Sequence, residues 1–356
     1  MKKVLISVPF LHTNYLPWVR AFNERGIVVV FVSLSTTLKF SDEIKVYYLA
    51  EGIGTIKKMF YYPGLKNISK IISYEKPDLI IARELSVTNI LLSIISKVKI
   101  KSQVLYYDQQ NLEFEHKFRK VARFFISKYF ITTVSNKSLV KELRYKNRYF
   151  VPFIFESRVT VNDIHKKFEN VQRIKIITVG KFREKRKNLL LLLDNLKDFL
   201  IKREVELILV GKIANPNDEL YVKIQGKAKE IVDRGGIVEV KANLSQEKLF
   251  DEYKRSHLFV LLSEREPASV SQFEAMAFGL PVILSDDNGT AYCVENNYNG
   301  FIVDISTNQF KNIMVRLLES KEELLRLSIN SLNNLEENYS RKNFMDTINE
   351  IINQIK

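Results

Sequence analysis

Short apolar runs alternate with amphipathic segments along most of the sequence, and this alternation restricts the folds that the chain can form. In the first part of the chain, strands are predicted at 3–8, 27–33, 45–50, 78–82, 103–107 and 130–134. Segments with helical spacing, such as "YLPWVRAFNERG", lie between them. Strands that alternate with helices form a parallel sheet covered on both faces, which explains why these runs are apolar throughout.

The alternation weakens at 151–173 and then resumes. In the second part of the chain, strands are predicted at 174–180, 205–211, 237–240, 257–262, 281–285 and 300–304. A length of 356 residues is sufficient for two domains. We therefore predict an α/β fold with two doubly wound, Rossmann-like domains. Each domain is expected to bind a ligand at the carboxyl ends of its strands.

The predicted domain boundaries lie where the alternation of strands and helices weakens. We place an N-terminal domain at 1–155, a linker at 156–172 and a C-terminal domain at 173–340. The last segment, 341–356, has the apolar spacing of a helix, and Ser340 is its predicted N-cap. We expect this helix to cross back and pack at the domain junction.

The apolar run near the N-terminus and the cysteine content indicate the cellular compartment. The apolar run that follows Lys3 is short and rich in β-branched residues, so we expect a buried strand and not a signal peptide. No apolar stretch reaches the length of about 18 residues that a membrane-spanning helix needs. The single cysteine, Cys293, excludes a disulfide framework. We expect a cytoplasmic protein.

A basic turn follows the strand predicted at 174–180, in "TVGKFREKRKN". Gly180 ends the strand, and Lys181, Arg186 and Lys187 come before a leucine-rich helix. Cationic side chains beside the free amides of a helix start are suited to hold phosphate oxygens. A solvated basic loop would have the same local pattern, so this stretch alone leaves both possibilities open.

Two acids stand on either side of a predicted helix start in "SEREPASVSQFEAMAFGLPVI". Glu266 follows a buried strand, and Glu274 lies inside the helix, which we expect to end at Gly279. Ser271 and Glu274 have the S-x-x-E spacing of a capping box, which would give Glu274 a purely structural role. Glu266 would then be an ordinary loop acid.

Several stretches together resemble the retaining GT-B glycosyltransferases of family 4, also called glycosyl transferases group 1. The stretch around Glu266 and Glu274 resembles the family's central motif, and "VGKFREKRKN" resembles its diphosphate-binding turn. "DNGTAYCVENNYNGFIVD" resembles the segment that follows, while "TTVSNKSLVKEL" and "YFVP" are similar to the end of its acceptor domain. The resemblance implies a GT-B fold, in which the two Rossmann-like domains face a central cleft.

The resemblance also implies a function. The chain would be a retaining hexosyltransferase that moves a sugar from a nucleotide-sugar, which we expect to be a UDP-sugar, to a glycan or lipid-linked saccharide. Such a reaction would serve bacterial surface polysaccharide assembly. The sequence contains no D-x-D pair, so we expect neither a metal nor another cofactor.

The resemblance assigns roles to individual residues. Glu266 would accept hydrogen bonds from the transferred sugar, and Glu274 would accept them from the ribose. Lys187 and Glu266 are the expected catalytic residues of the second domain, because cations there would stabilise the departing diphosphate. The full set of expected donor-binding residues is Gly180, Lys181, Arg186, Lys187, Glu266, Ala268, Ser269, Val270 and Glu274, with the amides of 268–270 facing the sugar and phosphates.

The sequence departs from the family pattern in places. Pro267 has no N–H to offer a ligand, and the glycine-rich turn after the first strand is replaced by "PFLHTNYLPW". The family's histidine after the fifth strand is not evident. Asp108 stands near that place and is our candidate for a group facing the reacting centre, with His116 and His12 as weaker candidates.

The positive charge is concentrated in the first part of the chain. Residues 1–150 contain 25 lysines and arginines against 11 acids, whereas the rest of the chain contains 30 of each. The segment 116–130 combines an aromatic stripe with basic flanks, which suits anionic lipid headgroups, although a core stripe with a solvated basic face would look the same. We place His12, His116, Lys117, Arg119, Lys120 and Arg123 on the acceptor or membrane side.

Two alternatives remain for the function. A non-catalytic GT-B-like protein that binds a glycan or a partner enzyme would explain the altered loop after Glu266 and the missing histidine. A nucleotide-sugar epimerase on the same fold has no motif in its favour. Nucleic acid is not an expected partner, because no nucleic-acid-binding motif is present.

Overall fold

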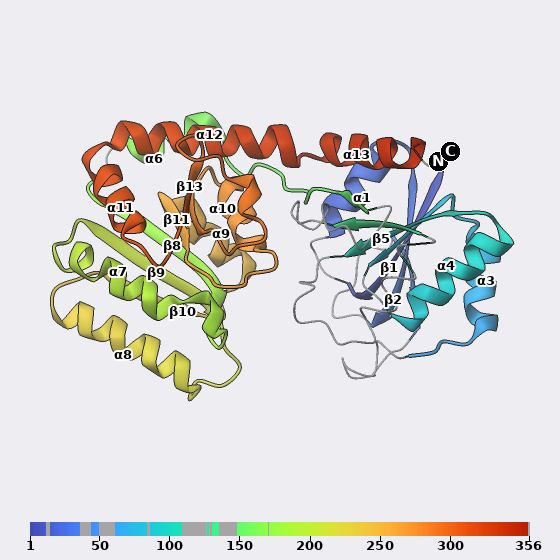
Figure 1. The fold of residues 1–356 in the computed structure, drawn as a ribbon, viewed down its shortest axis with the longest axis horizontal. Coiled ribbons are helices and arrows are strands. Elements are labelled where there is room, and N and C mark those ends of the chain that lie inside the picture. Colours follow the sequence, from blue (N-terminus) through green and yellow to red (C-terminus); the bar gives the residue numbers. More distant parts are fainter. Residues whose placement is uncertain are drawn as a thin grey trace. The chain divides into compact units, whose positions relative to one another are not determined.

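A computed structural model describes residues 1–11, 15–35, 44–49, 61–83, 86–108, 126, 128, 130–134, 148–169 and 171–354. The chain divides into two compact units (Figure 1). Unit 1 comprises Met1–Ile154 and Tyr339–Lys356, and unit 2 comprises Phe155–Asn338. No helix in the described ranges combines the length and apolar character needed to cross a membrane.

Unit 1 is built on a parallel sheet with the strand order β3-β2-β1-β4-β5-β6-β7. The chain order reverses beside β1, which is typical of doubly wound folds. The described strands are β1 (Lys3–Phe10), β2 (Val28–Ser35), β3 (Lys45–Tyr48), β4 (Leu79–Arg83), β5 (Gln103–Asp108), β6 (Ile131–Val134) and β7 (Arg148–Phe150). The six predicted strands are present. The sequence does not predict β7, a three-residue strand at the edge of the sheet.

Helices cover both faces of this sheet, as the apolar strands predict. Alternate residues of β1 point to opposite sides, so that Val4 and Ile6 join one hydrophobic core and Leu5 joins another. The first core includes α1 (Leu16–Asn23) and α13 (Arg341–Asn353), and the second includes α3 (Leu65–Glu75) and α4 (Val87–Lys99).

Helix α13 begins after Ser340, as predicted. The Ser340 side chain accepts a hydrogen bond from the Asn343 N–H. Phe344 then packs against Trp18 and Phe22 of α1, with ring centroids 4.9 and 6.0 Å apart. The C-terminal helix is therefore part of the core of unit 1.

Unit 2 repeats the same topology, with the order β10-β9-β8-β11-β12-β13 and parallel pairing. Its strands, all predicted, are β8 (Ile174–Lys181), β9 (Val205–Lys212), β10 (Val238–Ala242), β11 (Leu258–Leu261), β12 (Val282–Ser285) and β13 (Gly300–Val303). The order reverses between β8 and β11. The two sheets confirm the predicted α/β fold with two Rossmann-like domains.

The helices of unit 2 follow its strands. Helices α7 and α8 pack side by side on the sheet (Figure 1), and α10 contacts β11 and β12. They are α6 (Val161–Phe168), α7 (Leu189–Ile201), α8 (Glu219–Asp233), α9 (Gln246–Arg255), α10 (Val270–Ala277), α11 (Gln309–Glu319) and α12 (Lys321–Tyr339), with short 3₁₀ turns η4 (Lys185–Lys187) and η5 (Ala291–Cys293).

The linker expected at 156–172 is instead part of unit 2. Thr160 and Asp163 form a capping box that starts α6. Ile164 of this helix is buried, and a Cβ at Gly279 would overlap its side chain. Gly279 has a φ of +66° and ends α10, as predicted. The pattern predicted a linker because α6 is charged and buries a single residue.

Candidate donor-binding site

The first part of the site is the turn between β8 and α7. Gly180 lies near the end of β8, and η4 carries Lys187 back over it. A Cβ on Gly180 would lie 3.2 Å from Cδ and Cε of Lys187. The absence of a side chain at Gly180 therefore leaves room for the Lys187 stem, which is 7% exposed.

Lys187 meets Glu266, which follows β11. Lys187 Nζ lies 2.6 Å from Glu266 Oε2, and the Arg186 guanidinium pairs with the same oxygen. The other end of the guanidinium lies 2.7 Å from Glu184 Oε2. Glu266 is only 3% exposed. The turn and the loop thus form one cluster, in which Glu184 and Glu266 pair with cations of the turn.

Hydrogen bonds to the segment after β12 hold the backbone around Glu266 in place. The Glu266 N–H donates to the Asp287 carbonyl at 3.1 Å, and its carbonyl accepts from the Gly289 N–H at 2.7 Å. The Asp287 carboxylate accepts from the Arg265 N–H at 2.7 Å. Arg265 has a φ of +47°, so the loop turns sharply just before Glu266.

A buried hydrogen-bond network underlies this loop. The Asn288 amide donates to the Gln272 amide oxygen at 3.1 Å, and Gln272 donates to the Thr290 carbonyl at 2.9 Å. The Thr290 hydroxyl lies 2.8 Å from Asn288 Oδ1 and accepts from the Ser269 N–H at 3.0 Å. Sequence reasoning missed Gln272, Asn288 and Thr290. Asn288 and Thr290 lie in the stretch "DNGTAYCVENNYNGFIVD", whose resemblance to the family was the one signal that could have indicated them.

This network corrects the expectation for Ser269. Its N–H was expected to face the donor, but the Thr290 hydroxyl lies against it and accepts its hydrogen bond. Ala268 and Val270 are half-buried. The first amides of α10, including that of Val270, have no acceptor within the helix because they precede its first turn of hydrogen bonds.

Helix α10 connects this loop to the end of β8. The Ser271 hydroxyl lies 3.2 Å from the Val179 carbonyl. One turn further along, Glu274 Oε2 lies 3.1 Å from the Tyr253 hydroxyl of α9. The N-cap is Ser269, without a side-chain cap, so the capping-box interpretation of Glu274 is wrong.

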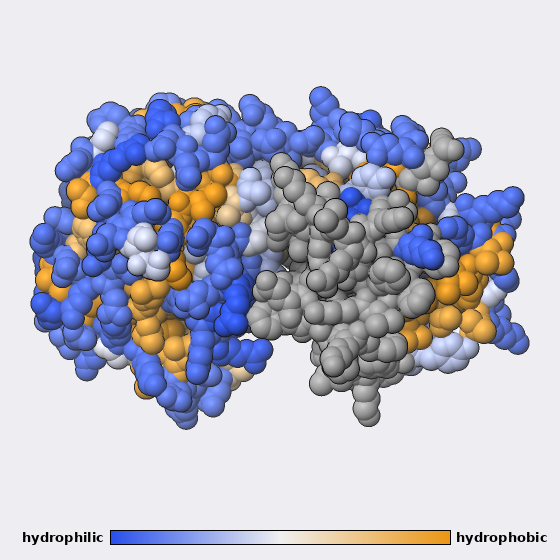
Figure 2. Space-filling model, in the orientation of Figure 1, coloured by the Kyte–Doolittle hydropathy of each residue, from blue (hydrophilic) through white to orange (hydrophobic). Residues whose placement is uncertain are grey.

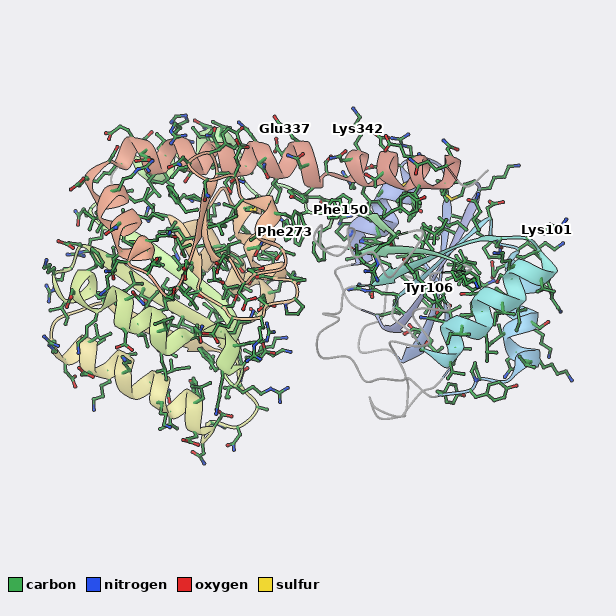
Figure 3. The ribbon with its side chains drawn as sticks, in the orientation of Figure 1. Lys101, Tyr106, Phe150, Phe273, Glu337 and Lys342 are labelled. Atoms are coloured by element: carbon green, nitrogen blue, oxygen red, sulfur yellow. The ribbon has the colours of Figure 1, made fainter. Side chains whose placement is uncertain are left out.

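The environment of Glu274 changes its acidity. Burial raises the pKa of its carboxyl, and the hydrogen bond from Tyr253 and the charge of Arg158 only partly offset this rise. Burial likewise raises the pKa of Tyr253 well above its ordinary value, and the Glu274 charge adds to it. Phe273, the neighbour of Glu274 in α10 (Figure 3), stacks on Phe155 with ring centroids 5.2 Å apart and fixes the helix from its buried side.

The predicted donor residues therefore fall into two groups. Gly180, Arg186, Lys187 and Glu266 meet at the carboxyl edge of the sheet, where β8 and β11 are neighbours and the strand order reverses. In doubly wound folds ligands bind at this position. Lys181 is exposed and pairs with Glu184 at 3.4 Å. Lys181 thus shares Glu184 with Arg186, whereas Glu274 is hydrogen-bonded to Tyr253 outside the cluster.

The residues predicted for unit 1 are mostly outside the described ranges. Asp108 is the last residue of β5, at the carboxyl edge of the sheet of unit 1, and its side chain is outside what the structure describes. The members of the predicted acceptor or membrane side are outside the described residues altogether: His12, His116, Lys117, Arg119, Lys120 and Arg123. Within the described part of the chain, no group of three His, Cys, Asp or Glu residues could hold a metal ion.

The segment that carries this site is similar to a known family. Residues 161–334 match the family model of the glycosyl transferases group 1. A 69-residue stretch is 36% identical to the UDP-Gal:alpha-D-GlcNAc-diphosphoundecaprenol alpha-1,3-galactosyltransferase of Escherichia coli. That match spans 19% of this chain and 18% of the relative.

Solved structures resemble nearly the whole chain. A glycosyltransferase from Rickettsia africae superposes with a TM-score of 0.76 at 16% identity, covering 99% of this chain and 98% of the other. Anabaena Alr3699/HepE, in complex with UDP and glucose, has a TM-score of 0.74 at 15% identity, covering 99% and 100%. Residues 161–334 are therefore similar to the glycosyl transferases group 1 family, and the chain has the GT-B fold.

Proposed function

We propose that the chain is a retaining, metal-independent glycosyltransferase that uses a UDP-sugar. The observation that carries this proposal is the buried Lys187–Glu266 pair, joined by Arg186, at the position where the strand order of unit 2 reverses. Two cations and one carboxylate at the start of a helix match a ligand that has both phosphates and hydroxyls. A nucleotide-sugar is such a ligand.

The charges suggest how the site would change when the donor binds. Phosphate oxygens would take over hydrogen bonds from Arg186 and Lys187, and this would release the Glu266 carboxylate to accept hydrogen bonds from the sugar. As the bond between the sugar and the diphosphate breaks, negative charge grows on the leaving phosphate. Lys187, already positioned and shielded from water, would stabilise that charge.

Glu274 would bind the other end of the donor. Its carboxylate projects from the same helix whose start contacts β8, and Tyr253 fixes its orientation through the hydrogen bond at 3.1 Å. Ribose hydroxyls would donate to the free carboxylate oxygen. Lys181, which is exposed, would contact the diphosphate after leaving Glu184.

The relatives support the choice of donor and acceptor. The name of the Escherichia coli relative includes UDP-Gal and a diphosphoundecaprenol acceptor, and the Anabaena protein binds UDP and glucose. We therefore propose a lipid-linked saccharide or glycan as the acceptor, in the assembly of bacterial surface polysaccharide in the cytoplasm. We further propose that unit 1 binds this acceptor and that Asp108 faces the reacting centre.

The test is UDP release from a panel of UDP-sugars, with product anomers assigned by NMR. We expect Lys187→Ala and Glu266→Gln to lower turnover by about a hundredfold or more, because each removes a group that contacts the donor. Lys185→Ala and Glu264→Gln are the matched controls, since both residues are exposed neighbours in the same segments. If the two site variants turned over as fast as the two control variants, the proposed site would be refuted.

A second candidate is a non-catalytic binding protein. Two observations favour it: Pro267 lacks an N–H, and the Ser269 N–H is already bound to Thr290, so this loop offers a donor few amides. Titration calorimetry with UDP separates the two candidates. The enzyme predicts heat that Lys187→Ala abolishes, whereas the binding protein predicts no heat with UDP.

A further inference from the structure

The hydroxyl of Tyr253 in α9 lies between two hydrogen-bond acceptors of α10. Its oxygen lies 3.1 Å from Glu274 Oε2 and 3.2 Å from the carbonyl oxygen of Ser271. A tyrosine hydroxyl carries a single proton, so it can donate to only one of these two oxygens at a time. Which oxygen receives the hydrogen bond therefore depends on whether the Glu274 carboxyl is ionised.

The packing of α9 against α10 fixes the position of this hydroxyl. Tyr253 is fully buried, and its ring stacks on Phe278 at the end of α10 with ring centroids 5.6 Å apart. Phe250, one turn earlier in α9, also contacts Phe278, with ring centroids 5.4 Å apart. Because these ring contacts hold the tyrosine, it does not need its hydroxyl to keep its place in the core.

When Glu274 is ionised, the Tyr253 hydroxyl donates to its carboxylate. The negative charge makes this hydrogen bond stronger than one to a neutral carbonyl. The Ser271 carbonyl loses little, because a carbonyl inside a helix also accepts from the amide four residues further along. The second carboxylate oxygen of Glu274 can then accept a hydrogen bond from a hydroxyl group of a ligand.

When Glu274 is protonated, the same three groups form a chain in the opposite direction. The carboxyl takes one proton from solvent on Oε2 and donates it in a hydrogen bond to the Tyr253 oxygen. The tyrosine keeps its own proton and turns it to the Ser271 carbonyl, so each group still has a partner. A neutral carboxyl is a weaker acceptor than a carboxylate. The protonation state therefore decides how strongly Glu274 can hold a ligand hydroxyl.

Two groups favour the ionised state of Glu274 against the effect of burial. Burial raises the pKa of this carboxyl, whereas the hydrogen bond from Tyr253 and the positive charge of Arg158 lower it. The Arg158 N–H donates to the Ala277 carbonyl at 2.7 Å, and its guanidinium lies 5.1 Å from the centre of the Phe250 ring. Among the described residues, the titratable and charged groups that act on Glu274 thus come from α9 and from the segment before α6.

We propose that Tyr253 is a positioning residue that links donor binding to the protonation of Glu274. It holds the ionised carboxylate for the ribose of the donor, and it turns to the Ser271 carbonyl when the carboxyl is neutral. The inference rests on the proposed function, because it needs the ribose at Glu274. It adds a pH dependence: the affinity for the ribose is complete where Glu274 is ionised and is lost as the pH falls through the pKa of its carboxyl.

The test is titration calorimetry of the full chain with two ligands, UDP and the diphosphate of 2′,3′-dideoxyuridine, from about pH 5 to 9. Both ligands carry the same titrating phosphates, so the ratio of their dissociation constants reports the ribose hydroxyls alone. In the native chain we expect UDP to bind about tenfold more tightly at high pH. This preference should disappear as the pH falls.

Tyr253→Phe should move this loss to higher pH. Without the hydroxyl the carboxylate loses its hydrogen bond, so the pKa of Glu274 rises further. Most of the preference for UDP should return at the highest pH, whereas a purely structural defect would lower it at every pH. Arg158→Gln, on an exposed side chain, should shift the loss in the same direction and leaves the core unchanged.

The matched control is Tyr106→Phe, which removes a buried tyrosine hydroxyl from unit 1. This hydroxyl lies 2.8 Å from Ser93 Oγ of α4. Figure 3 labels Tyr106 beneath α4, and Figure 2 shows hydrophobic residues gathered over that helix, so the control hydroxyl is shielded from water as that of Tyr253 is. The control should keep the native pH profile.

The outcomes separate this inference from the proposed function. The same pH profile in the native chain and in Tyr253→Phe would overturn the inference, as would an equal shift in the Tyr106 control. Equal affinity for the two ligands at every pH would also overturn it, although binding of UDP would still support the donor site. Absence of UDP binding by the native chain would refute the proposed function together with this inference.

Discussion

One oxygen of Glu266 accepts hydrogen bonds from both Lys187 and Arg186, and this makes the carboxylate the centre of the cluster. Replacing Glu266 with alanine would leave Lys187 buried with no carboxylate beside it. We expect this to lower the free energy of unfolding by about 3 kcal/mol, whereas Glu264→Ala, on an exposed side chain, should change it little. Chemical denaturation measures the free energy of unfolding of both variants.

The same variant has a second expected property. If UDP binds as proposed, it would have to compete with Glu266 for the two cations in the native chain, but not in Glu266→Ala. The rise in melting temperature on adding UDP should therefore be larger in the variant than in the native chain. A smaller rise, or none, would show that these cations do not bind the diphosphate.

Glu75 gives unit 1 a dependence on pH. Burial alone would raise the pKa of this carboxyl, but hydrogen bonds from Lys45, Tyr47 and Lys3 outweigh it and lower the pKa to about 2. The folded pKa is below the ordinary value of 4.5, so the stabilisation is complete above that value and is lost as the pH falls from about 4.5 to 2.

We expect Glu75→Gln to lower the free energy of unfolding by about 2 kcal/mol at pH 7, and by progressively less below pH 4.5. Urea titrations at pH 7, 4 and 3 test this. Glu336→Gln, on an exposed side chain, is the comparison and should show no such dependence. A constant difference between Glu75→Gln and the native chain across this range would contradict the assignment.

At the scale of elements, the contact between α6 and the end of α10 joins two segments far apart in the sequence. Gly279→Ala would strain a residue whose φ is +66° and would push against Ile164. We expect a loss of about 2 kcal/mol. Gly226→Ala, in α8 with open space around it, should instead stabilise the chain by about 0.5–1 kcal/mol.

Combining Gly279→Ala with Ile164→Ala separates strain from overlap. If the new methyl group occupies space that Ile164 vacates, the double variant should lose less stability than the sum of the single variants. Urea denaturation of the four chains gives the coupling. Strict additivity would mean that backbone strain alone explains the glycine.

The elements also show what the sequence could predict. Apolar runs predicted the strands, because buried parallel strands are apolar on both sides. Helix α6 was missed because it buries one residue, and β7 because it is short. The turn with Lys187 and the loop with Glu266 could be predicted from motifs. Their support by Gln272 and Thr290 could not, because those hydrogen bonds join residues 16–21 positions apart that no local pattern connects.

At the scale of the whole molecule, the two units differ in how the chain builds them. Unit 2 is one continuous stretch, Phe155–Asn338, with its own sheet and core. We therefore expect residues 155–338, expressed alone, to fold cooperatively and bind UDP about as tightly as the full chain does. Circular dichroism and calorimetry test this. Absence of UDP binding by a folded fragment would mean that unit 1 contributes to the nucleotide site.

Unit 1, in contrast, is made of segments before and after unit 2, because Phe344 of α13 fills the space beside Trp18 and Phe22. A ribosome releases unit 2 in full before it releases this helix. Of the two units, the one whose translation begins earlier is thus the one that is completed later, and a nascent chain interrupted after Asn338 would expose the aromatic side chains of α1 to chaperones and proteases.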